Sequence, residues 1–256
     1  MTPAVQPTDS AAPPGMIPAP AHPLRAIAQP GIDAIRKLWL PFLVIQACGL
    51  IVVVAYFYVE PFKRFCEMLA RVKQAGGYPF AALAMGVASG VAPEVFKYIT
   101  GVDRSLDNKR LRNLTFNFLL FCVAGLPVDK FYRWLPEVFG SNNTPLVVAK
   151  KVAVDQFVYS PLVGLAIVAV AYTWREHRYR IGPTLRSFGV AWYISRVATL
   201  LLPCWAYWMP MTTLMYSLPS TLTFVFGVPA SAAAATVLIA VAERKVVREQ
   251  SALPPA

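Results

Sequence analysis

Long apolar segments alternate with short polar and basic segments along this chain. Their lengths are close to the ~20 residues that a helix needs to cross the hydrocarbon core of a bilayer. The pattern therefore predicts an all-α integral membrane protein, a bundle of about five to six transmembrane or membrane-embedded helices. The apolar segments are residues 38–58, 78–99, 114–128, 152–172, 188–208 and 221–242.

The polar segments divide the chain into four parts. Residues 1–30 are rich in Pro and Ala and are expected to form a disordered tail. Residues 31–59 contain an N-terminal span, 60–246 the main membrane domain, and 247–256 a short C-terminal tail. At the start of the main domain, residues 61–74 alternate basic and apolar positions, which predicts an interfacial amphipathic helix.

Two regions of the main domain contain residues that interrupt helices. We expect Gly125 to Pro127 to end the third span before a solvated stretch that begins at Asp129. The last third of the chain has two interpretations: two full spans, or an interfacial helix, a broken segment and one span. We favour a helix broken between Pro210 and Pro219, because proline lacks the N–H that a continuous helix uses.

Composition agrees with a membrane protein. Charged residues make up only 14% of the chain and the mean hydropathy is +0.51, whereas a soluble domain is about 25% charged. The formal net charge is +11. Lys and Arg lie between the apolar segments rather than in one stripe, which fits lipid headgroups and argues against nucleic acid. Their distribution favours both termini on the more basic side of the membrane.

The sequence contains no motif of a serine hydrolase, a nucleotide-binding loop or a metalloprotease. We therefore expect no enzymatic activity and no cofactor. The cysteines form no closely spaced pair and the histidines are isolated, so we expect neither a disulfide framework nor a metal site. These residues are Cys48, Cys66, Cys122, Cys204, His22 and His177.

Small residues recur every fourth position in the second span, at Ala82, Gly86 and Gly90. That spacing puts them on one helix face. A face without bulky side chains lets another helix approach closely. We expect this face to be a helix-packing surface.

The fourth span begins with a cluster of polar residues. Lys151 and Asp155 are four residues apart on one helix face, and Gln156 can hydrogen-bond to a neighbouring helix. Pro161 is expected to kink the helix beneath them. Lys151 and Asp155 are either interfacial, with Gln156 joining two helices, or Asp155 and Gln156 face a water-filled path.

Arg196 lies near the middle of the fifth apolar segment. It either extends to the membrane surface or pairs with an acid such as Asp155 or Glu94. In the second case it joins the same polar cluster.

Lys151, Asp155, Gln156 and Pro161 match a K-x-x-x-D-Q-x-x-x-x-P signature. In this signature the chain resembles the Mpv-seventeen and peroxisomal membrane protein family. Three further pieces occur in the family's order, across residues 60–246. They are Tyr78-Pro79, Gly125 with Phe131-Tyr132 and Leu135, and Trp205 with Trp208 and Pro210. Phe131 stands where the family has Trp, and the prolines after Gly125 and Trp208 come one residue late.

The resemblance implies a small multi-span protein of a mitochondrial inner, peroxisomal or plastid membrane, or of an inner membrane if the source is bacterial. It implies channel-like permeability and no established enzymatic activity. The candidate residues that it adds are Gly125, Tyr132, Pro161, Trp208 and Pro210. The resemblance implies that these motif residues have a structural role.

Two functions are compared. The leading hypothesis is a weakly selective channel for small ions or metabolites, with Lys151, Asp155, Gln156 and Arg196 lining or gating the path. The alternative is a non-transporting scaffold or assembly protein. It would bind partner membrane helices or a second copy through the face of Ala82, Gly86 and Gly90. Under both hypotheses the protein is embedded in a lipid bilayer.

Overall fold

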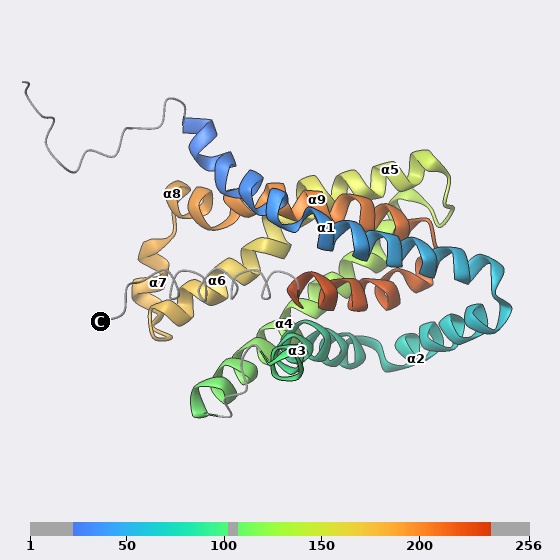
Figure 1. Ribbon diagram of the computed structural model, residues 1–256, viewed down its shortest axis with the longest axis horizontal. Helices are drawn as coiled ribbons and strands as arrows, with labels where there is room; N and C mark the ends of the chain where they lie inside the picture. The colour runs from blue at the N-terminus through green and yellow to red at the C-terminus, as the bar shows by residue number, and fades with distance from the viewer. Residues whose placement is uncertain (1–22, 102–106, 237–256) are drawn as a thin grey trace, which may run out of the picture.

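The computed structural model describes residues 23–101 and 107–236, and within these residues it is helical with no strand (Figure 1). The all-helical prediction is confirmed for this part of the chain. The helices are α1 (Pro23–Tyr58), α2 (Glu60–Met85), η1 (Gly86–Val91), α3 (Ala92–Thr100), α4 (Asn108–Phe139), α5 (Pro145–Val154), η2 (Asp155–Gly164), α6 (Leu165–Glu176), α7 (Ile181–Ser187), α8 (Val190–Tyr193), η3 (Ile194–Ala198), α9 (Thr199–Tyr216) and η4 (Ser220–Leu222). A last helix continues from η4 over residues 223–236.

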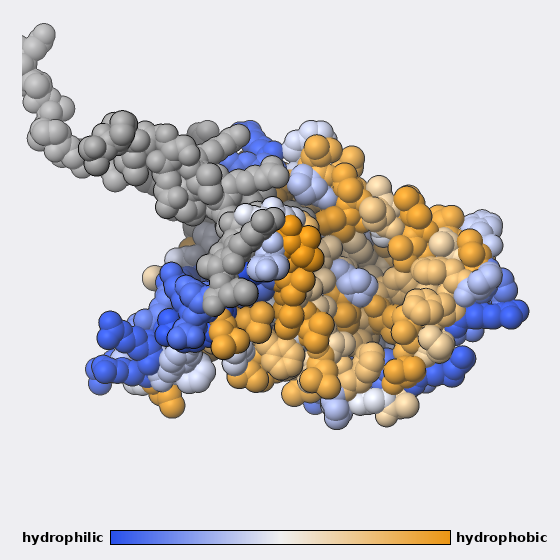
Figure 2. Space-filling view, turned by 60° about the horizontal axis from the view of Figure 1, so that its bottom comes forward, coloured by the Kyte–Doolittle hydropathy of each residue, from blue (hydrophilic) through white to orange (hydrophobic). Residues whose placement is uncertain are grey.

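Several of these elements join end to end into long helices. Four are long and apolar enough to cross a membrane: Gly31–Tyr58, Glu60–Thr100, Asn108–Phe139 and Pro145–Glu176. A fifth is added if the pair Ile181–Ser187 and Val190–Tyr216, bent by 88°, counts as one span, and Ser220–Thr236 is a shorter apolar helix. Figure 2 shows an apolar surface between hydrophilic groups at the two ends of the molecule.

Helix α1 packs along α9. Leu38 and Phe42 of α1 meet Tyr207 and Met211 of α9 in a buried cluster. The helix begins at Pro23, within the segment 1–30 that we expected to be a tail. Residues 1–22 and the predicted tail 247–256 lie outside the described residues.

Helix α2 contains one sharp break, at Gly77. Its φ of 54° and ψ of −140° are far from helical values and suit glycine, which has no Cβ. The break separates the amphipathic segment from the apolar segment that continues through η1 and α3. On the first arm Cys66, Ala70 and Lys73 share one buried face, as the alternating pattern of residues 61–74 suggested.

The helix made of the second arm of α2, η1 and α3 lies directly against α4. A Cβ built on Gly90 would come within 2.7 Å of the Cα of Phe118, and one on Gly86 would collide with Cys122 Sγ. From the other side, a Cβ on Gly125 would lie 2.8 Å from the carbonyl oxygen of Ala81. The glycines therefore allow two backbones to touch, and α4 covers the face that we predicted to pack.

The expected end of the third span at Gly125 to Pro127 is wrong. Helix α4 runs without interruption from Asn108 to Phe139 with Pro127 and Pro136 inside it. Gly125, two residues before Pro127, is packed against α2, and this tertiary contact supports the helix near the missing hydrogen bond. Asp129 is consequently not solvated but wholly buried.

The break expected between Pro210 and Pro219 is confirmed, and it lies at the Pro219 end of that range. Helix α9 includes Pro203 and Pro210 and ends at Tyr216, so the chain bends only at residues 217–219. A side chain of another helix bonds to the backbone near Pro210: Gln46 of α1 donates to the carbonyl of Tyr207 at 2.6 Å. Threonines do the same, since Thr212 donates to the carbonyl of Trp208 at 2.7 Å.

Candidate functional site

Asp129 of α4 is the carboxylate at the centre of a buried ion cluster. Its Oδ1 contacts the ammonium of Lys73 from α2, and its Oδ2 lies 2.7 Å from Nη2 of Arg133. Each cation also lies over an aromatic ring, Lys73 at 5.1 Å from the ring of Phe224 and Arg133 at 5.1 Å from that of Tyr78. Two cations share one carboxylate, so the cluster keeps a net positive charge.

A cavity of about 270 Å³ adjoins this cluster, and we refer to it as the basic cavity. It lies where the last turns of α4 meet the first arm of α2 and the start of the last helix. Both cations of the cluster line it, together with hydroxyl and amide groups. Its lining residues are Lys73, Gln74, Tyr132, Arg133, Pro136, Ser220, Thr221 and Phe224.

Asp155 lies in a different environment. Only 5% of its surface is exposed, and its Oδ2 accepts a 2.5 Å hydrogen bond from the hydroxyl of Tyr216 in α9. The ring of Tyr216 meets that of Tyr132 edge to face at 6.1 Å between centroids. Within residues 23–101 and 107–236 no cation forms an ion pair with Asp155. Tyr132 thus lies between the basic cavity and the residue that binds Asp155.

The rest of η2 is joined to α8 and α9 by neutral hydrogen bonds. Trp205 Nε1 donates to the carbonyl of Gln156 at 2.8 Å, and Tyr193 donates to that of Pro161 at 3.2 Å. The wide turns of η2 coincide with Pro161, whose missing N–H disturbs the regular helical bonding. The structure thus has a π-helical stretch at Pro161 inside the continuous helix Pro145–Glu176, and the predicted kink stays a prediction.

We call the contact between η2 and α9 the Asp155 seam. Two of its buried polar atoms have no hydrogen-bond partner in the described part of the chain. They are Oε1 of Gln156 and the hydroxyl of Tyr159. Buried polar groups in folded proteins are hydrogen-bonded in the great majority of cases. The seam around Asp155 therefore has unused capacity to bind a polar solute or water.

Lys151 and Arg196 do not join Asp155. Lys151 is buried, but no carboxylate of the described residues lies within ion-pair distance of its ammonium. The expectation that Arg196 pairs with Asp155 or Glu94 is wrong. Arg196 binds both carboxylate oxygens of Glu176 at 2.7 Å, in an exposed pair.

Glu94 has its own partners at the other end of the α2–α4 contact. Its Oε1 lies 2.9 Å from Nζ of Lys97 and its Oε2 lies 3.8 Å from Nε of Arg110. Nη2 of Arg110 also donates to the carbonyl of Glu94 at 2.6 Å. Glu94 is therefore a second buried carboxylate shared by two cations, joining α3 to α4.

The motif residues of the family resemblance lie at several different helix contacts. Gly125 packs on Ala81, and the ring of Phe131 stacks on that of Tyr159 at 4.0 Å. Trp208 borders the α1–α9 cluster and Pro210 is exposed on α9.

Sequence reasoning missed Lys73, Asp129, Tyr159 and Tyr216. The apolar run that ends at Val128, directly before Asp129, was the available sign of burial. The described residues contain no group of His, Cys, Asp and Glu that could bind a metal ion.

No protein-family model, no curated protein and no solved structure matches this chain.

Proposed function

We propose that this chain is a multi-span membrane protein that lets small solutes cross the membrane with weak selectivity. Large apolar side chains point outward along the long helices: Ile51 of α1 is 66% exposed, Leu119 of α4 57% and Leu162 of η2 64%. Water would make such a continuous apolar surface unfavourable, whereas lipid would not. Membership of the Mpv-seventeen family is part of this proposal and rests on the motif residues.

The path that we propose begins in the basic cavity and passes Tyr132 to Tyr216 and Asp155. The single observation that carries this proposal is that Tyr132 lines the cavity and also contacts Tyr216, which binds Asp155. Lys73 and Arg133 give the mouth of the path a positive potential that favours anions. Oε1 of Gln156 and the hydroxyl of Tyr159 supply hydrogen bonds further in.

The path is closed at Asp155 in the conformation described. Asp155 and Tyr216 are 5% and 3% exposed, and their hydrogen bond joins η2 to α9. Opening requires Tyr216 to release the carboxylate, and a released carboxylate would itself select against anions. Weak selectivity follows from a cationic mouth in series with an anionic gate.

The scaffold alternative receives less support. Its surface was the face of Ala82, Gly86 and Gly90, and α4 covers Gly90 with its backbone and Gly86 with the side chains of Phe118 and Cys122. A partner helix would have to displace α4, with the Glu94 and Asp129 clusters, to reach it.

The test is planar-bilayer conductance of the purified protein, with selectivity read from the reversal potential in a salt gradient. Asp155→Asn removes the charge and keeps the shape, so we expect a changed conductance and a shift toward anions. Glu137→Gln, an exposed neutralisation on α4, is the matched control and should leave both unchanged. Conductance and selectivity of Asp155→Asn equal to those of the wild type would remove Asp155 from any gating role.

A further inference from the structure

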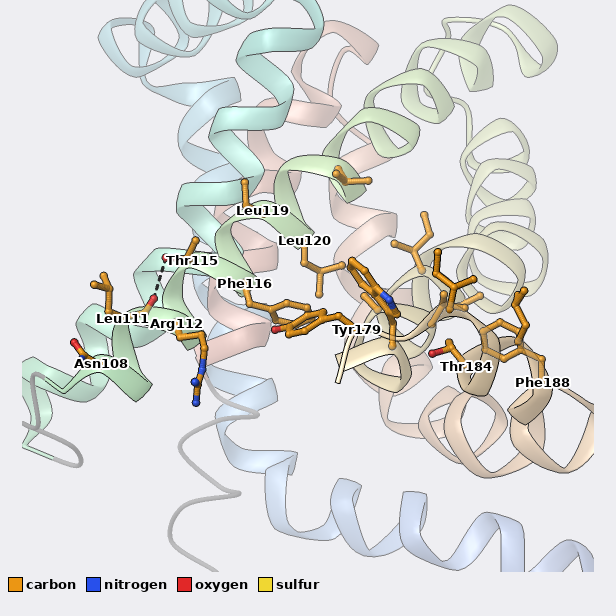
Figure 3. Close-up of a pocket in the computed structure, with 18 residues that line it drawn as sticks. Asn108, Leu111, Arg112, Thr115, Phe116, Leu119, Leu120, Tyr179, Thr184 and Phe188 are labelled. Atoms are coloured by element: carbon orange, nitrogen blue, oxygen red, sulfur yellow. Dashed lines mark hydrogen bonds between the residues drawn. The ribbon is translucent and has the colours of Figure 1, made fainter. Parts of the chain in front are cut away.

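A large apolar groove lies on the flank of the bundle, far along α4 from the basic cavity. Its volume is about 1310 Å³, above the ~300–1,000 Å³ of pockets for drug-sized ligands. Leu119, Leu120 and Val123 of α4 form one wall, and Ile167 and Val170 of α6 form the other. Helix α7 and Tyr179 close it at one end, and Figure 3 shows Tyr179 and Phe116 between the two walls.

The polar groups of the groove gather at the start of α4. Figure 3 shows Arg112 beside Asn108 and Leu111, away from the apolar centre. Arg112 is exposed and forms no ion pair with any described residue. The guanidinium of Arg175 lies 4.8 Å from the ring of Phe116, a groove residue, and donates to Asn113. Two guanidinium groups therefore flank one mouth of an apolar groove.

This end of the bundle is strongly cationic. The acids near it are already engaged: Glu176 binds Arg196, and Asp107 accepts from the backbone N–H of Arg110 at the start of α4. One guanidinium group can donate two parallel hydrogen bonds to two oxygens of a phosphate, which makes arginine a preferred phosphate ligand. The cations of this end are Lys109, Arg112, Arg175, Arg178, Arg180 and Arg186.

We propose that the groove binds one anionic phospholipid of the surrounding bilayer, with an acyl chain between α4 and α6 and its phosphate on Arg112 and Arg175. Charge decides between this occupant and a second copy of the chain. A symmetric contact between copies would bring two sets of these arginines together, whereas an anionic headgroup neutralises them. The lipid site is independent of any solute path through Asp155.

Native mass spectrometry of the full chain, extracted from bilayers of phosphatidylcholine and phosphatidylglycerol, tests the proposal. We expect one retained phosphatidylglycerol per chain, in preference to phosphatidylcholine. The double variant Arg112→Gln, Arg175→Gln should abolish the preference. Ala166→Phe, which fills the groove, should abolish retention of either lipid.

Matched controls lie outside the groove. Arg71→Gln removes an exposed arginine on α2, and Ala149→Phe adds a ring to an exposed position on α5. Both should keep wild-type lipid retention. The proposal is overturned if both groove variants retain the lipid as the wild type does, or if the wild type shows no preference for phosphatidylglycerol. It is equally overturned if Ala166→Phe dissociates a dimer and leaves lipid retention unchanged.

Discussion

Two helix seams of this bundle are held together by opposite means. Between α2–α3 and α4, the carboxylates of Asp129 and Glu94 each bind two cations, and glycines bring the backbones into contact. Between η2 and α9, Asp155 accepts one hydrogen bond from Tyr216, and the other ties are neutral. In the first seam every carboxylate is paired with cations, and the second contains a carboxylate without a cation.

The difference indicates which seam can open. Parting the first seam would separate opposite charges in a medium of low dielectric constant, which is very unfavourable. Parting the second breaks a few hydrogen bonds, each worth about 0.5–1.5 kcal/mol, or 1.5–3 kcal/mol where one partner is charged. The α2–α4 seam therefore acts as the rigid frame, and the seam at Asp155 is the place where a conformational change costs least.

Neutralising Asp129 gives the largest expected effect. Asp129→Asn leaves Lys73 buried without its anion, which we expect to lower the free energy of unfolding by about 3–5 kcal/mol. Asp155→Asn leaves no cation unpaired and should cost much less. Tryptophan fluorescence during thermal unfolding in detergent measures both. Equal losses in the two variants would contradict the comparison of the seams.

A compensated variant sharpens this test. Lys73→Met together with Asp129→Leu removes both buried charges, and Arg133 stays partly exposed to solvent. We expect the double variant to recover most of the stability that Asp129→Asn loses, since apolar replacement of a buried ion pair is often neutral or better.

Adding one methyl group to the first seam gives the next largest effect. Gly90→Ala forces the backbone of Phe118 away, and we expect a loss of about 1–3 kcal/mol, as for other overpacked cores. Gly182→Ala is the control: it is also helical, and its Cβ meets no atom within 4 Å. It should be neutral or stabilising by up to about 1 kcal/mol. Similar melting temperatures for the two variants would show that the seam is loosely packed.

The sequence predicted the helical class and the long helices because hydropathy sums over many residues, and single prolines change the sum little. It failed where a single residue had to be judged. Pro210 lies inside α9, and Gln46 donates to the carbonyl of Tyr207, 161 positions after it in the sequence and one turn before that proline. No local pattern contains that contact.

The candidate site was predicted in part for the same reason. Asp155 and Gln156 stand out because polar residues in an apolar run are rare. The partner of Asp155 is 61 positions away and depends on the rotation of α9 about its axis. Asp129 was assigned to solvent because it follows Pro127, and only the packing of α2 against α4 brings Lys73 to it.

Removing one hydroxyl from each of two tyrosines of α9 separates stability from function. Tyr216 donates to Asp155, and Tyr207 donates to the carbonyl of Ala230 at 2.7 Å. Each change to Phe should cost about 1–2 kcal/mol in unfolding free energy, because a buried acceptor loses its donor. Only Tyr216→Phe should change the bilayer conductance. Equal conductance changes in both variants would assign the effect to helix packing instead of the gate.

The smallest effect is expected at Arg196, whose ion pair with Glu176 has near-ideal geometry but is open to solvent. The side chains are 45% and 49% exposed, and exposed pairs are worth about 0–1 kcal/mol. Arg196→Gln should therefore lower the melting temperature slightly, and less so in high salt, because salt screens exposed charges. Arg64→Gln breaks the more exposed pair with Glu60, and it should lower the melting temperature by the same small amount or less. A loss at Arg196 as large as that at Asp129 would mean that burial does not govern the strength of these pairs. The distinction between a frame held by buried ion pairs and a seam that can open would then lose its physical basis.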